Sequence, residues 1–138
     1  LEKRMIKEIQ EVMKAMNLAV LDLPGASAKK LLTALRWVPS RLLQSQLAKQ
    51  VSRGRGDRLP SFQVDLNAGK GQNEVIYHNG AVHQIGRELN VSTPINGALT
   101  HILLQLVHEE VNWEIYDGKP KELVQAVNEY IRNQRETA

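Results

Sequence analysis

Aliphatic side chains recur at every third or fourth position over most of this 138-residue chain, which is the spacing of one face of an α-helix. The helices that this spacing predicts cover residues 2–17, 28–38, 40–51, 60–69, 74–89, 95–116 and 121–135. With only two Trp, three Tyr and one Phe in the chain, the core must consist of aliphatic side chains. The sequence therefore predicts an all-α fold, a bundle of about seven helices in a single domain over residues 1–138.

Residues that favour helix ends bound several of these segments. Ser27 can cap the helix over 28–38, and Pro39 follows its last residue, where a helix must stop or kink. Leu23-Pro24-Gly25 is typical of a turn. Thr93 can cap the helix that follows it, and Pro94 suits its first position because a missing N–H is no loss there.

Four of the predicted helices carry more detailed expectations. In residues 2–17 the charged residues, Glu8 among them, fill the side opposite the apolar stripe. The helix over 95–116 is apolar on so many sides that we expect it at the centre of the fold, and in residues 121–135 we expect Leu123, Val124, Val127, Tyr130 and Ile131 to face inward. Residues 74–89 also fit a hairpin turning at Asn79-Gly80, but the helical spacing is better over the whole length. Gly80 would then be a flat spot where another helix packs closely.

Composition and charge argue against several classes of protein. The net charge of +3 is small and concentrates in a predicted loop, Arg53–Arg58, so nucleic-acid binding is not expected and is kept as the weakest alternative. No apolar run is long enough to span a membrane. The absence of cysteine excludes disulfides and thiolate metal sites and is compatible with a cytoplasmic protein. No metal site is expected among the four histidines: His101 and His108 would lie about 10 Å apart along one helix.

The residues with the most chemistry lie between Pro60 and Leu89. This stretch holds a hydroxyl at Ser61, carboxylates at Asp65 and Glu74, and the corner Gly69-Lys70-Gly71. The corner matches neither a P-loop nor a dinucleotide-binding fingerprint. From spacing alone, Glu74 is most simply an acid favoured in the first turn of a helix, with acceptance from a sugar hydroxyl as the functional alternative.

The same stretch resembles the C-terminal domain of the ketopantoate reductase (2-dehydropantoate 2-reductase) family. The resemblance rests on the order and spacing of five pieces: Pro60–Leu66, Gly69–Gly71, Glu74-Val75, Asn79–Val82 and Gly86–Leu89, continued by Val91 and Thr93–Asn96. It implies a fold like that of the C-terminal domains of the 6-phosphogluconate dehydrogenase superfamily. The first fifty residues are compatible with the family but add little to the resemblance.

The resemblance also implies a function. In that family NADPH, held mainly by an N-terminal Rossmann domain, reduces the 2-oxo acid ketopantoate to pantoate in pantothenate biosynthesis. Residue by residue, it implies that Ser61 binds the substrate, that Glu74 contacts the cofactor and that Asp65 is structural. The family's catalytic lysine would lie upstream of residue 1, so no catalytic residue is expected in this chain and the chain alone is expected to be inactive.

Two alternatives remain at this stage. One is the same domain in a reductase for another 2-oxo acid, since Arg58 stands where some members have asparagine. The other is a stand-alone helical module that forms homodimers or binds a partner, for which the last two predicted helices offer apolar surface.

Overall fold

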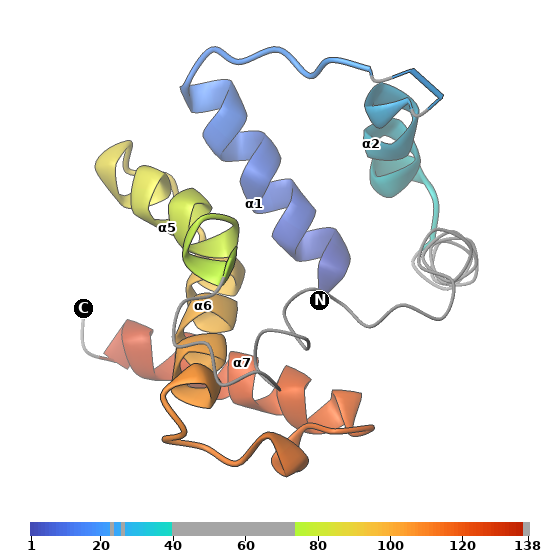
Figure 1. Ribbon diagram of the computed structural model, residues 1–138. Coiled ribbons are helices and arrows are strands. Elements are labelled where there is room, and N and C mark those ends of the chain that lie inside the picture. Colours follow the sequence, from blue (N-terminus) through green and yellow to red (C-terminus); the bar gives the residue numbers. More distant parts are fainter. Residues whose placement is uncertain (23, 26, 40–73, 137–138) are drawn as a thin grey trace.

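The computed structural model describes residues 1–22, 24–25, 27–39 and 74–136. These residues form five α-helices, which are labelled in Figure 1, and two short 3-10 helices. In chain order these are α1 (Glu2–Ala15), α2 (Ala28–Trp37), η1 (Glu74–Ile76), α5 (Asn79–Glu88), α6 (Pro94–Val107), η2 (Trp113–Ile115) and α7 (Pro120–Glu136). No strand occurs in the described part of the chain, so the predicted all-α fold is confirmed and the hairpin alternative for residues 74–89 is wrong. The helices predicted over 40–51 and 60–69 lie outside the described residues.

Helix α6 occupies the centre of the described fold, as its apolar character predicts. It packs against α1, α5 and α7 (Figure 1). Ile95, Ala98 and Ile102 of α6 form the buried core together with Val127 and Ile131 of α7. Because these side chains are almost completely removed from water, each Ile and Val among them contributes about 1.5–3 kcal/mol of hydrophobic stabilisation, and the smaller Ala98 contributes less.

The central helix is shorter than predicted, because it ends at Val107 and not near Tyr116. The polar run His108-Glu109-Glu110 follows, and Glu109 takes the left-handed conformation with φ of 57°, which cannot continue a helix. Asn112 then begins η2 by accepting a hydrogen bond from the backbone N–H of Glu114 (3.0 Å). Beyond the break, Trp113 and Ile115 are about half exposed (50% and 48%), whereas Tyr116 packs against the core.

The predicted helix over 74–89 is also divided. Its first turn is η1, and α5 begins only at Asn79, since His78 has a non-helical backbone (φ −102°, ψ −89°). Val75 is buried, but Leu89 at the other end is exposed. In α7, Val124 is exposed, which corrects the inward orientation predicted for it.

The start of α2 follows the prediction. The Ser27 hydroxyl accepts a hydrogen bond from the backbone N–H of Lys30 (3.2 Å), and the Asp22 carboxylate accepts one from the N–H of Lys29 (2.9 Å). The hydrogen bond from Lys29 is the main reason that the pKa of Asp22 is lowered. A lowered pKa means that this contact stabilises the fold above the ordinary pKa of an aspartate and is lost as the pH falls through the lowered value.

The glycines of α5 differ in how much room surrounds them. A methyl group at Gly80 would touch Thr100 of α6 at an ordinary 3.4 Å, which confirms the predicted close approach of another helix. A methyl group at Gly86 would lie 2.8 Å from the side chain of Thr93 and 2.9 Å from the carbonyl oxygen of Val91. Position 86 therefore has no room for a larger residue.

Gly86→Ala should accordingly destabilise the protein, although alanine favours helices. We expect a loss of about 1–3 kcal/mol in the free energy of unfolding, the usual cost of overpacking. Gly80→Ala is the matched control in the same helix and should leave stability unchanged or raise it by up to about 1 kcal/mol. Urea denaturation followed by circular dichroism measures both, and equal midpoints for the two variants would contradict the prediction.

Candidate functional site

The structure places one of the two predicted site residues. Glu74 is the first residue of η1, whereas Ser61 lies outside the described residues, as do Asp65 and the Gly69–Gly71 corner. Helix η1 packs against both α5 and α6. Its middle residue, Val75, is only 5% exposed and anchors the turn in the protein interior.

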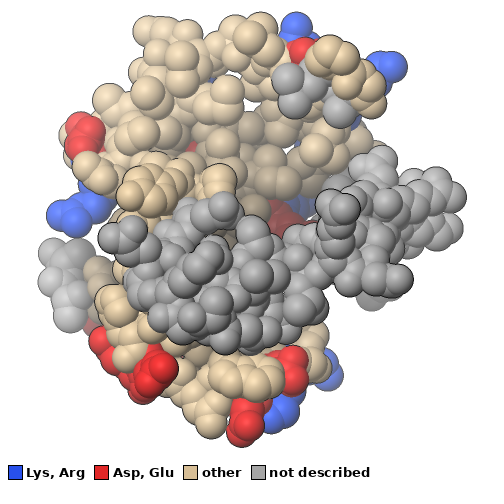
Figure 2. Space-filling view, viewed as in Figure 1, with Lys and Arg blue, Asp and Glu red and all other residues tan. Residues whose placement is uncertain are grey.

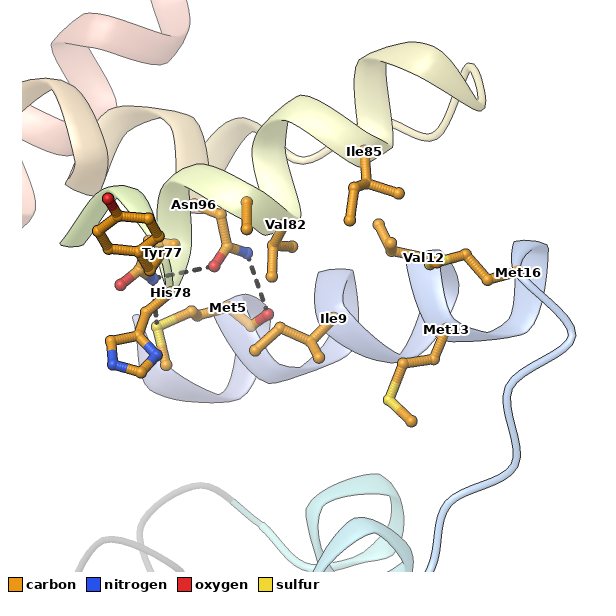
Figure 3. Close-up of a pocket in the computed structure, with 12 residues that line it drawn as sticks. Met5, Ile9, Val12, Met13, Met16, Tyr77, His78, Val82, Ile85 and Asn96 are labelled. Carbon is orange, nitrogen blue, oxygen red and sulfur yellow. Dashed lines mark hydrogen bonds between the residues drawn. The ribbon is translucent and has the colours of Figure 1, made fainter. Parts of the chain in front are cut away.

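A groove of about 440 Å³ lies between α1 and α5 and reaches the residues that follow η1 (Figure 3). Most of its wall is aliphatic or thioether surface from the two helices, contributed by Met5, Ile9, Val12, Met13, Met16, Ala81, Val82 and Ile85. One end is polar, because Tyr77, His78, Asn79 and Asn96 line it. Tyr77 is 76% exposed at this end.

Three side chains form a buried hydrogen-bonded network beneath the polar end of the groove. The Asn79 amide Nδ2 donates to Asn96 Oδ1 (2.9 Å) and more weakly to the Met5 sulfur (3.4 Å). The Asn96 Nδ2 donates to the Glu8 carboxylate (2.7 Å) and to the Met5 carbonyl oxygen (3.3 Å). Because Asn96 is fully buried and uses both ends of its amide, this network fixes how α1, α5 and α6 meet.

Glu8 is the charged member of this network, and its position corrects the sequence prediction. It was expected on the solvated side of its helix, but it is only 8% exposed. Its two carboxylate oxygens accept the backbone N–H groups of Ile95 and Asn96, both at 2.9 Å. Glu8, almost ninety positions away in the chain, therefore satisfies the free N–H groups of the first turn of α6. Its negative charge also interacts favourably with the helix dipole.

The sequence predicts that the Thr93 side chain caps α6, but it does not. The contact of Glu8 with the first turn of α6 explains why. The Thr93 hydroxyl instead shares a hydrogen bond with Nδ1 of His83 (3.0 Å). The His83 ring lies directly over Gly97, where a methyl group would meet it at 2.7 Å. Pro94 does begin the helix, as predicted.

Two of the histidines contact other side chains. His101 lies against the ring of Tyr130, with centroids 5.0 Å apart, and His108 approaches the Glu110 carboxylate at 3.8 Å. Among the described residues, no group of three or more histidine, aspartate or glutamate side chains could hold a metal ion.

None of the helices in the described part of the chain is long and apolar enough to cross a membrane.

A second groove, of about 890 Å³, separates α1 from α2. Its charged wall is mainly cationic, with Lys3, Lys7, Lys14 and Arg36 against the single carboxylate of Glu11. The chain between α6 and α7 has the opposite character: Figure 2 shows acidic side chains gathered at that end of the molecule. Four exposed acids, Glu109, Glu110, Glu114 and Asp117, stand there with one lysine, Lys119.

Comparison with known families identifies the family of this chain. The family model described as "Ketopantoate reductase PanE/ApbA C terminal" matches residues 1–107, which is more than three quarters of the chain. The chain belongs to this family. The resemblance found in the sequence is thereby confirmed, and the matched range holds α1, α2, η1, α5, α6 and the buried network between them. No curated protein and no solved structure matches the chain.

Membership in the ketopantoate reductase C-terminal family indicates a domain of an oxidoreductase of that type, and the helical architecture agrees with it. Sequence reasoning missed Glu8 and Asn96 as the residues that organise the site. A signal for Glu8 was present, because positions 5, 8 and 12 follow the spacing of one helix face and the other two are apolar. Helix α7 lies beyond the matched range, although it supplies two of the five buried core residues.

Proposed function

We propose that residues 1–138 are the C-terminal, substrate-side domain of an NADPH-dependent reductase that converts ketopantoate to pantoate. The family match over residues 1–107 carries this proposal. The proposal assigns substrate binding to Ser61 and a contact with the cofactor to Glu74. It also places the proton-donating lysine and the nucleotide-binding domain outside this chain, so the chain alone should be inactive.

The residues of this chain fit one part of a cofactor site. A carboxylate at position 74 can accept hydrogen bonds from ribose hydroxyl groups or from an amide. Its turn, η1, is followed directly by Tyr77 and His78, which line the polar end of the α1–α5 groove. The sequence contains no Gly-x-Gly-x-x-Gly loop that would bind a pyrophosphate. NADPH would supply the hydride when bound, and its phosphates would be held by a Rossmann domain.

On the substrate side, the proposed role of Ser61 is to orient the 2-oxo acid. Its hydroxyl can donate to a carboxylate or a keto oxygen, which are the two acceptors that any 2-oxo acid presents. Holding the keto carbon at a fixed angle to the hydride donor lowers the entropic part of the barrier. Ketopantoate is the substrate that the family description indicates.

The test compares Ser61→Ala and Glu74→Ala in the reductase formed by this chain and its Rossmann domain. Loss of a hydrogen bond to a charged or polar ligand group costs about 1.4 kcal/mol, which is tenfold in affinity. We expect Glu74→Ala to raise the NADPH dissociation constant about tenfold, measured by titration of nucleotide fluorescence. Ser61→Ala should lower kcat/KM for ketopantoate by about tenfold, measured from NADPH consumption.

Two exposed residues near the ends of α5 and α6 serve as matched controls. Glu88→Ala and Ser92→Ala remove the same chemical groups from the surface and should leave both constants unchanged within about twofold. If both site variants behave like these controls, the assignment of Ser61 and Glu74 is wrong. If Ser61→Ala impairs another 2-oxo acid but the wild-type enzyme does not use ketopantoate, the reaction class stands and the substrate assignment fails.

A further inference from the structure

We infer that Asn79 is a positioning residue for the cofactor side of the site. In this role it holds η1, and with it Glu74, through the buried network of Glu8 and Asn96. The inference rests on the proposed function, because it assumes that Glu74 contacts NADPH. It goes further by assigning a role to Asn79, a residue to which neither the sequence pattern nor the proposed function gives one.

The first step is that Asn96, the hydrogen-bond partner of Asn79, is held in one orientation. Asn96 cannot turn its amide over, because its Nδ2 donates to Glu8 at 2.7 Å and to the Met5 carbonyl oxygen at 3.3 Å. Its Oδ1 therefore faces α5 and accepts the Asn79 amide at 2.9 Å. Figure 3 shows Asn96 and its hydrogen bond to the Met5 carbonyl oxygen of α1.

The second step is the short connection from Asn79 to η1. Asn79 is the first residue of α5, and only Tyr77 and His78 separate it from the last residue of η1. The first turn of α5 also lies directly against η1, since a methyl group at Gly80 would be 3.4 Å from the Val75 carbonyl oxygen and 3.6 Å from Ile76 Cβ. A shift of the α5 N-terminus therefore moves η1, whose first residue is Glu74.

The third step concerns the junction between η1 and α5. His78 has a non-helical backbone, and no side-chain cap closes the start of α5. The Asn79–Asn96 hydrogen bond instead ties the first residue of α5 to α6. Without it, the start of α5 loses its connection to the buried network, and η1, which packs against α5, loses that support.

A double-mutant cycle on NADPH binding tests the inference in the intact reductase. We expect Asn79→Ala to raise the NADPH dissociation constant about fivefold, within the range of measured couplings between residues of one network. In a Glu74→Ala background, the same change should add less than about twofold, because the group being positioned is already gone. Both constants come from equilibrium fluorescence titration and need no turnover.

Two further variants distinguish a positioning role of Asn79 from a general loss of stability. Val127→Ala opens a cavity in the α6–α7 core and should lower stability by about as much or more, yet leave the NADPH dissociation constant unchanged. If Asn79→Ala fails to fold, Asn79→Asp takes its place, since it keeps the shape and removes the donor while an acid is favourable at a helix start.

The outcomes are distinct. Independent effects of Asn79→Ala and Glu74→Ala, which multiply in the double variant, would overturn the inference and leave the proposed function standing. So would an unchanged NADPH dissociation constant in the Asn79 variant alone. If Glu74→Ala itself has no effect on NADPH binding, the proposed cofactor contact fails, and the inference fails with it.

Discussion

Glu8→Ala should destabilise this protein more than any other single change that removes one side chain from α1. The substitution leaves the backbone N–H groups of Ile95 and Asn96 without their acceptor, in a place that water reaches poorly. The Asn96 amide also loses its shorter hydrogen bond and keeps the longer one to the Met5 carbonyl oxygen. A buried donor without a partner costs about 1–3 kcal/mol. We expect a total loss on the order of 4 kcal/mol, a large share of the roughly 5–15 kcal/mol of a typical domain.

Urea denaturation followed by circular dichroism measures this loss of stability. Two further variants in α1 show whether the hydrogen bonds of Glu8 cause it. Glu11→Ala removes the same group from the exposed side of the helix and should change stability by less than about 0.5 kcal/mol. Glu8→Gln keeps the shape but offers one acceptor oxygen where the carboxylate has two, so we expect about half of the alanine effect. A loss below about 1 kcal/mol for Glu8→Ala would mean that the carboxylate does not hold the first turn of α6.

The helices were predictable because periodicity is a local property. Residues 2–17, 28–38 and 121–135 correspond closely to α1, α2 and α7, and Ser27 and Pro94 lie where their chemistry places them. The breaks were less predictable. The end of α6 at Val107 depends on three polar residues, one of them a left-handed glutamate, which interrupt a pattern that otherwise continues to Ile115.

The buried network could not be predicted by the same reasoning. Spacing rules assign charged residues to the outside, and Glu8 is inside because the N-terminus of a helix 87 positions further along the chain supplies its donors. Nothing in the sequence around Glu8 or around Ile95 reveals that the two meet. The proposed roles of Ser61 and Glu74 come from the family motif and not from geometry.

Asn96→Asp should make stability depend on pH in a way that the wild-type protein does not show. In the folded protein the substitution puts a second carboxyl where the amide donates to Glu8 at 2.7 Å. Two carboxylates this close cannot both stay ionised, so the pKa of the introduced carboxyl is raised in the folded state. Its unfolded value is about 3.9.

The sign of the effect follows from proton binding. A group whose pKa is raised by folding stabilises the fold below its unfolded pKa, and this contribution is lost as the pH rises toward the folded value. The deficit of Asn96→Asp relative to wild type should therefore be smallest near pH 4 and grow by about 1.4 kcal/mol per pH unit until the raised pKa is reached.

Urea denaturation at a series of pH values between about 4 and 7 tests this, with Asn128→Asp as the control. Asn128 is exposed on α7, so the same chemical change there should give a deficit that stays nearly constant over this range. A constant deficit for Asn96→Asp would show that its new carboxyl and Glu8 do not share a dry site. A deficit that grows with pH only at position 96 requires the two groups to be close and shielded from water, which is the arrangement that fixes α1, α5 and α6 around the proposed cofactor contact.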